Sequence, residues 1–258
     1  MLIQQIRDSI TKQSLLKNQD GWKNILMDVP PILWFGNMES DKPKIVTIGA
    51  NPSNREFFSL KGKAYHRFNY SAINPYNPIE LEHAYNNYFN NLPYRGWFGS
   101  EKGTKVEAFL HGLDASYYDN TDKKYQAIHI DFFPFATSKK FTDDEVLPIV
   151  KESLFDTQWT NRSVADLIAA IHPKLIFMFG STNIDCFRKF VPEIASKYAY
   201  SDWITWSNGI VNTRYMVGKN NQNNFPPIVL LSAYWGNPRG FKTNDITALA
   251  KHILKNHI

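Results

Sequence analysis

Residues 45–53 read Ile45-Val46-Thr47-Ile48-Gly49-Ala50-Asn51-Pro52-Ser53, a short apolar and β-branched run that changes abruptly into a turn. Such a run predicts a buried strand of a parallel sheet. Open α/β sheets bind their ligands beyond the carboxyl ends of their strands. Gly49 is expected to adopt a backbone conformation that other residues avoid, and Pro52 prevents the strand from continuing. The turn is therefore predicted to present Asn51 to a crevice, although Asn-Pro-Ser is also an ordinary turn sequence.

Three more short apolar runs have the character of buried parallel strands, and helical patterns lie between them. The predicted strands are 44–49, 125–131, 174–179 and 228–232, and the predicted helices are 2–18, 105–113, 143–154, 163–171 and 182–190. Ser181 or Thr182 is expected to cap the helix over 182–190, and Asn244-Asp245 to cap a closing helix. Residues 203–206 and 210–217 predict a hairpin around Ser207-Asn208-Gly209. This alternation predicts an α/β fold in three layers, α/β/α, with a central, mostly parallel four-stranded sheet.

The segment at about 60–122 differs from its surroundings because it is rich in Asn, Tyr and Phe. We interpret it as an insertion in a single domain that spans 1–258. Its aromatic side chains, with Arg67, Arg95, Lys102 and Lys105, suit the stacking of bases and the binding of phosphates. The alternative is a polar surface around a buried aromatic cluster.

Composition restricts the classes of function. The chain has 258 residues and a net charge of +5, which mildly favours an anionic partner such as nucleic acid. Its single cysteine, Cys186, excludes an intramolecular disulfide, an all-cysteine zinc site and a four-thiolate iron–sulfur cluster. We expect a reducing cytoplasm as the location, no membrane span and no cofactor. The histidines lack the spacing of a metal site, so no metal is expected either.

Polar residues follow three of the predicted strands: Gly49-Ala50-Asn51-Pro52, Asp131-Phe132-Phe133-Pro134-Phe135-Ala136-Thr137 and Ser232-Ala233-Tyr234-Trp235-Gly236-Asn237-Pro238-Arg239-Gly240. Parallel strands bring such ends to one crevice. A fourth segment is His172-Pro173-Lys174-Leu175-Ile176-Phe177-Met178-Phe179-Gly180. The four segments follow one another in the same order as the sequence motifs of the uracil-DNA glycosylase superfamily. The chain resembles in particular its single-strand-selective monofunctional and mismatch-specific branches, over roughly residues 40 to 245.

The resemblance implies a uracil-DNA glycosylase-like fold and a monofunctional DNA glycosylase in which Asn51 orients the attacking water. It places Gly49, Ala50, Pro52 and Asp131 at the flipped base. Phe57, Phe58 and Phe132 are candidates for a wall that stacks on this base, with core packing as the alternative. Trp235 and Asn237 stand where the family has a His-Pro-Ser-Pro loop, so its histidine is missing. Ser53 stands where the family usually has a glycine, and serine is acceptable there if its φ is negative.

Asp131 stands where the family places a base-reading asparagine. An ionised carboxylate only accepts hydrogen bonds, whereas an amide also donates. The substitution therefore favours a base that carries an exocyclic amine, such as a modified cytosine of the kind found in phage genomes, over uracil. The alternatives are that Asp131 is a strand-end cap or is protonated by burial.

Residues directly after the last loop are predicted to contact DNA. Arg239 and Lys242 suit flanking phosphates, and Phe241 suits the gap that a flipped base leaves. Phe241 is alternatively a staple onto the last helix. Two other functions stay open: a nucleic-acid-binding protein on the same fold that has lost catalysis, and a hydrolase of free nucleosides or nucleotides.

Overall fold

A computed structural model describes residues 1–16, 24–59, 67, 74, 76–139, 157–220, 225–233 and 240–257. Its helices are α1 (Leu2–Leu16), α2 (Pro78–Asn86), α3 (Val106–Gly112), α5 (Thr157–Ile171), α6 (Ser181–Phe190), α7 (Pro192–Ala195) and α8 (Thr243–His257), with short 3-10 turns η2 (Asn54–Glu56) and η4 (Tyr88–Asn90). Its strands are β1 (Trp34–Phe35), β2 (Lys44–Gly49), β3 (Ala115–Ser116), β4 (Tyr125–Asp131), β5 (Leu175–Phe179), β6 (Tyr198–Tyr200), β7 (Ile204–Ser207), β8 (Asn212–Asn220) and β9 (Ile228–Leu231).

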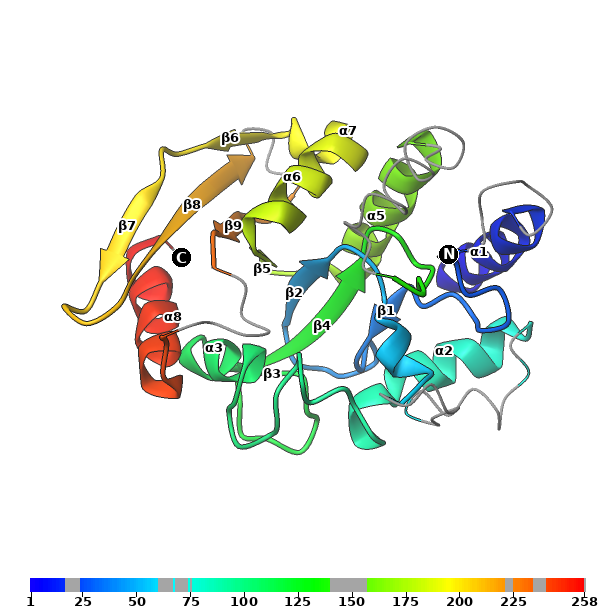
Figure 1. The fold of residues 1–258 in the computed structure, drawn as a ribbon, viewed down its shortest axis with the longest axis horizontal. Coiled ribbons are helices and arrows are strands. Elements are labelled where there is room, and N and C mark those ends of the chain that lie inside the picture. Colours follow the sequence, from blue (N-terminus) through cyan, green and yellow to red (C-terminus); the bar gives the residue numbers. More distant parts are fainter. Residues whose placement is uncertain are drawn as a thin grey trace.

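One mixed sheet forms the centre of the fold (Figure 1). Its main path runs β1-β4-β2-β5-β9-β8-β6, while β3 pairs with β4 and β7 pairs with β8. The four predicted strands are β4, β2, β5 and β9, which lie side by side and parallel. Every residue of β2, β5 and β9 is buried, as expected for strands that helices cover on both faces.

The expectation of a four-stranded sheet was wrong, because the described residues form a nine-stranded sheet. The five additional strands flank the parallel centre. β1 pairs antiparallel with β4, and the β7–β8 hairpin, which was predicted, joins the sheet through β8 and β9. β1 and β3 have two residues each, so they are too short to show a periodic pattern of hydrophobic residues in the sequence.

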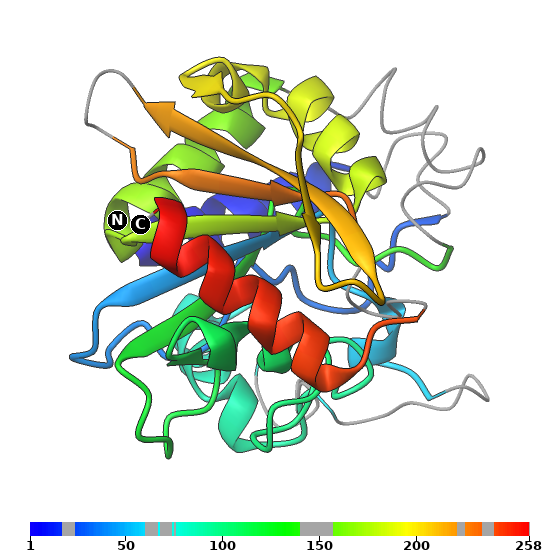
Figure 2. The same cartoon turned by 90° about the vertical axis from the view of Figure 1, so that its left-hand side faces the viewer.

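Helices cover both faces of the sheet (Figure 2). α3 and α8 pack against each other on one face, where Phe109 of α3 meets Phe177 and Phe179 of β5 at ring-centroid distances of 5.0 and 5.4 Å. α5 and α6 lie on the other face, and α1 contacts both α2 and α5. No helix among the described residues is long and apolar enough to cross a bilayer.

Three predicted helix boundaries differ from the structure. α5 begins at Thr157, six residues before the predicted start. The N-cap of α6 is Gly180, so neither Ser181 nor Thr182 caps this helix. The φ of Gly180 is 90°, a value that glycine adopts readily. α8 begins at Thr243, so Asn244-Asp245 lies inside its first turn. The predicted helix over 143–154 and residues 17 and 18 of the first helix lie outside the described residues.

The described part of the 60–122 segment is mostly folded into the core. Its large rings form a buried cluster in which Phe89 stacks on Tyr117 at 4.7 Å and Phe98 meets Tyr88 at 5.7 Å. Rings that are buried against one another are not available to stack on bases. The described part of this segment therefore fits the alternative interpretation, a polar surface around a buried aromatic cluster.

Candidate active site at the carboxyl edge of the sheet

Two loops lie side by side where β2 and β4 end. The backbone NH groups of Phe132 and Phe133 donate to the carbonyls of Gly49 and Ala50, at 3.2 and 3.0 Å. Further on, Ser53 and Thr137 form a parallel bridge. The predicted convergence of the first two strand ends is thus present in the structure.

The Asn51 side chain is half-buried and held by its amide nitrogen. Nδ2 donates to the carbonyls of Pro52 and Phe135 at 3.1 and 3.2 Å and to Thr137 Oγ1 at 3.1 Å. Because two of these partners are carbonyls, which only accept, the side chain must face them with its NH2 group. Its Oδ1 accepts no hydrogen bond from any residue that the structure describes. The two loops therefore fix this amide through its nitrogen, and neither loop donates to its carbonyl oxygen.

Gly49 is required for space, and the expectation of an unusual backbone conformation was wrong. Its φ is not positive, whereas six other glycines in the described part of the chain have positive φ. A Cβ on Gly49 would lie 2.3 Å from Asp131 Oδ1 and 2.9 Å from His129 Nε2. Glycine at the end of β2 thus lets two polar side chains of β4 come directly over the backbone. Ser53, in contrast, has φ −72°, so serine is compatible with this turn.

Asp131 is nearly buried and its carboxylate has a histidine neighbour. Asp131 Oδ1 lies 3.3 Å from His129 Nε2, and the residues are 5% and 3% exposed. His129 Nδ1 lies 2.8 Å from Thr47 Oγ1, which in turn lies 2.6 Å from the Tyr117 hydroxyl. Asp131 therefore lies beside a buried hydrogen-bonded chain of Tyr117, Thr47 and His129. The sequence pattern gave no role to His129, because its proximity to Thr47 depends on strand register.

Glu56 is a second buried carboxyl beside the turn that carries Asn51, and it was not predicted. It is 2% exposed, and the Tyr88 hydroxyl donates to Glu56 Oε2 at 2.5 Å. Burial raises the pKa of Glu56 to about 8, against the opposing effects of the Tyr88 hydrogen bond and of Arg67, while Asp131 adds to the rise. Glu56 is consequently a neutral acid at pH 7.

We expect Glu56→Gln to stabilise the protein at alkaline pH. A carboxyl whose pKa is 4.5 when unfolded and about 8 when folded contributes stability below pH 4.5 that is lost as the pH rises through 8. Glutamine keeps the acceptor for Tyr88 but does not ionise. Between pH 5 and pH 8, urea unfolding should show the variant gaining about 3 kcal/mol relative to the wild type.

Glu101→Gln is the matched control for this titration, since it makes the same chemical change on an exposed side chain. An equal gain in both variants, or no gain in Glu56→Gln, would contradict the assignment of the stability change to the buried Glu56 carboxyl.

Two of the three predicted stacking residues belong to the core. Phe57 and Phe132 are 0% and 1% exposed, and Phe132 packs 6.4 Å from the ring of Phe190 in α6. A ring that is enclosed on both faces cannot receive a base, so the alternative of core packing holds for both. Phe58 is half-buried and keeps some accessible surface.

The residues predicted after the last strand are only partly described. Trp235, Asn237 and Arg239 lie outside the described residues. Phe241 is half-buried and packs against the hydrophobic core. Lys242 is exposed, and its backbone NH donates to Asp245 Oδ2 at 2.9 Å. The Lys242 side chain is thus accessible to a partner.

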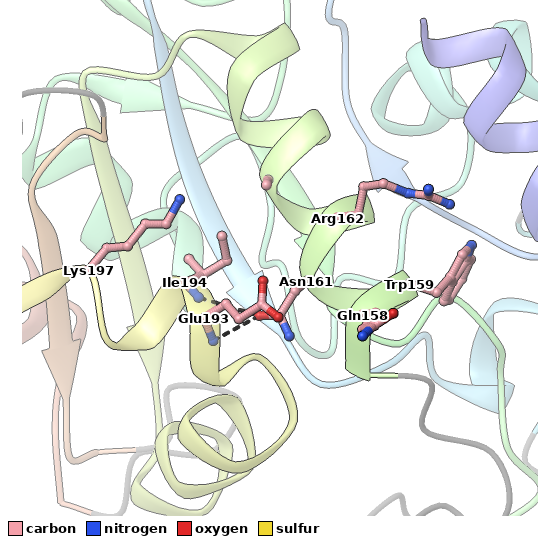
Figure 3. Close-up of a pocket in the computed structure, with 8 residues that line it drawn as sticks. Gln158, Trp159, Asn161, Arg162, Glu193, Ile194 and Lys197 are labelled. Carbon is pink, nitrogen blue, oxygen red and sulfur yellow. Dashed lines mark hydrogen bonds between the residues drawn. The ribbon is translucent and has the colours of Figure 1, made fainter.

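A groove of about 600 Å³ lies along α5 and α7 (Figure 3). Its lining combines Gln158, Trp159, Asn161, Arg162 and Ala165 of α5 with Glu193 and Ile194 of α7 and Lys197. The carboxamide oxygen of Asn161 accepts from the backbone NH groups of Glu193 and Ile194, so this side chain anchors the start of α7. None of the predicted site residues that the structure describes lines the groove.

No group of three or more His, Cys, Asp or Glu side chains among the described residues is arranged to hold a metal ion. A scan against models of protein families and a search of curated proteins found no match to this chain.

Proposed function

We propose that the protein is a monofunctional DNA glycosylase that releases a damaged or modified base, uracil or a modified cytosine, from a nucleotide turned out of the stack. The observation that carries the proposal is the arrangement of Asn51. Its amide nitrogen is bound by Pro52, Phe135 and Thr137, while its carbonyl oxygen has no donor among the described residues. That oxygen can accept a hydrogen bond from one water molecule and fix the position of that water.

The proposed reaction hydrolyses the bond between the sugar C1′ and a base nitrogen. The water oxygen forms a bond to C1′, the C1′–N bond breaks, and its electron pair leaves with the base. The water gives up a proton to bulk solvent, since a neutral amide such as Asn51 is barely basic. Positive charge develops on the sugar and negative charge on the base, so the rate depends on positioning and electrostatics.

The neighbouring residues suit this chemistry. Residues 49–53 and 131–137 contain no lysine, so the two loops offer no amine for a Schiff base, and water is the expected nucleophile. The net charge of +5 and the exposed Lys242 favour a polyanionic substrate. A base must leave the duplex, or lie in a single strand, to reach a site at the edge of a sheet.

The test is release of a base by the wild-type protein from a panel of labelled oligonucleotides, single- and double-stranded. Each contains one uracil, one cytosine or one 5-modified pyrimidine at the same position. We expect an abasic site, detected as strand cleavage after hot alkali, on at least one member. Binding to the panel with no product on any member would instead support a protein that binds nucleic acid without catalysis.

A further inference from the structure

The tip of the β7–β8 hairpin (residues 207–212) extends beyond the carboxyl edge of the sheet. β8 runs antiparallel to β9, and Ser232, the residue after β9, bonds to Arg214 near the start of β8. The Ser232 backbone NH donates to the Arg214 carbonyl at 2.9 Å, and the Arg214 NH donates to Ser232 Oγ at 3.3 Å. The tip therefore lies on the side to which the arrowheads of β5 and β9 point (Figure 2). This is the edge of the sheet that carries Asn51.

Hydrogen bonds hold the tip in one conformation and anchor it to α8. Asn208 Oδ1 accepts from the backbone NH groups of Ile210 and Val211, both at 3.0 Å. Asn208 Nδ2 donates to Oδ1 of Asp245, in the first turn of α8, at 2.6 Å. A turn that is fixed in this way loses little conformational freedom when it binds a partner. The side chain of Ile210 is thus presented from a prearranged support.

Ile210 is apolar and almost completely accessible. It is 86% exposed, more than any other large hydrophobic residue that the structure describes. The space beside it is open, because a Cβ on Gly209 would meet no atom within 4 Å. A single exposed apolar side chain is not a binding site by itself. Its role depends on the groups that flank the tip.

Arg214 flanks the tip on the face of the hairpin that points away from α8. The neighbouring Tyr215 points toward α8, where its hydroxyl lies 2.8 Å from His257 Nε2, and successive side chains of a strand alternate between faces. Arg214 is exposed, and its guanidinium lies 5.5 Å from the ring centre of Trp203. No carboxylate within the described residues pairs with Arg214. Its charge is therefore available to an anionic partner.

The other exposed side chains on the Arg214 face are uncharged. They belong to Thr205, which is paired with Arg214, and to Ser207 and Asn212, which are paired with each other. The exposed Asp202 precedes β7 at the end away from the tip. This face of the hairpin therefore offers a cation and hydrogen-bonding groups near the tip.

Lys242 flanks the tip from the α8 side. Its backbone NH donates to Asp245 Oδ2 at 2.9 Å, while the other oxygen of this carboxylate holds Asn208 of the tip. The Lys242 side chain is exposed, and its ammonium group makes no ion pair with a described residue. The apolar tip thus has one unpaired cation on each side.

We propose that the β7–β8 hairpin is a contact surface for a nucleic-acid strand, in which Ile210 enters between neighbouring bases and Arg214 and Lys242 bind the flanking phosphates. Proteins that unstack a base step combine an apolar wedge with cations at the backbone in this way. Neighbouring strands lie about 4.8 Å apart, so β8 lies about 14 Å from β2, and a bound strand can reach the turn that carries Asn51. The choice of a nucleic acid as partner rests on the proposed function and on the net charge of +5.

The first measurement is the affinity for a short fluorescent DNA duplex at several salt concentrations. We expect Arg214→Gln and Lys242→Gln each to lower the slope of log K against log salt by about 1, since each removes one phosphate contact. Lys219→Gln is the matched control, because Lys219 is exposed at the other end of β8, and it should keep the wild-type slope. Equal slopes in all four proteins would overturn the inference and leave the hairpin to a protein partner.

The second measurement compares this duplex with one that contains a tetrahydrofuran residue, which leaves a gap in the base stack. We expect the wild type to prefer the gapped duplex and Ile210→Ser to lose about tenfold of its affinity for it, because serine has little apolar surface to bury. Ile210→Leu should retain the preference. Equal preferences in the serine and leucine variants would overturn the role of Ile210.

Both measurements can be separated from the test of the proposed function, because neither needs base release. Binding that depends on Ile210, Arg214 and Lys242 without any released base would contradict the glycosylase and support the hairpin. Base release by a wild type whose affinity none of these variants changes would overturn the hairpin alone. Ile210 is exposed, so its variants should unfold at the wild-type temperature, which thermal unfolding checks.

Discussion

Asn51→Ala is expected to reduce base release by at least about a hundredfold while the fold and the affinity for DNA are retained. Fixing an attacking group in a near-attack geometry contributes several powers of ten to a rate, and alanine leaves the water with no acceptor. The substitution removes the donor of three acceptors, on Pro52, Phe135 and Thr137. Because Asn51 is half-buried, water can donate to these acceptors in its place. Single-turnover cleavage of an oligonucleotide that the wild type processes measures the rate, and thermal unfolding checks the fold.

Asn54→Ala is the matched control for Asn51→Ala. Asn54 lies in the same loop and its Nδ2 donates to the carbonyl of Ser138 at 3.1 Å, so it also connects the loops after β2 and β4. We expect the Asn54 variant to retain most of the activity. If both variants lost the same fraction, loop coupling would explain the loss. If Asn51→Ala released base at the wild-type rate, Asn51 would not position the water.

The centre of the fold was predictable because its signals are local. Each strand of the parallel centre is a short apolar run, and β2, β5 and β9 are buried along their whole length. A run of this kind can be recognised without knowledge of its neighbours. The flanking strands could not be found in the same way. Trp34 and Phe35 form an edge strand only because β4 lies next to them.

The site was predictable only in part, since its chemistry depends on register. The break after Ile48 was sufficient to single out Asn51, because a polar amide at a strand end is visible in the sequence. His129 looked like one more residue of a buried strand until its pairing with Thr47 was known. Glu56 stood in a polar stretch and gave no sign of burial. Gly49 illustrates the same limit: the sequence predicted that glycine matters, but the reason is the carboxylate of Asp131 above it.

Asp131→Asn is expected to reverse the preference for the base. The side chain keeps its shape, and the amide oxygen can take the place of Asp131 Oδ1, which lies 3.3 Å from His129 Nε2 in the wild type. The second oxygen is replaced by an NH2 group, which donates where the carboxylate accepted. A donor faces the exocyclic carbonyl of uracil favourably and the amine of cytosine unfavourably. Sites built on such hydrogen bonds discriminate strongly, so we expect a change of at least about a hundredfold in the ratio of rates.

Two oligonucleotides with the same 5-substituent, one on cytosine and one on uracil, measure that ratio under single-turnover conditions. Asp131→Ala separates a change in base recognition from a general loss of activity, because alanine removes the acceptor without supplying a donor. It should lower the rate on the cytosine substrate and leave no reversed preference. A ratio that is unchanged in Asp131→Asn would contradict a base-reading role. Release of both bases at equal rates by the wild type would do so as well, because a side chain that reads the base must distinguish an amine from a carbonyl.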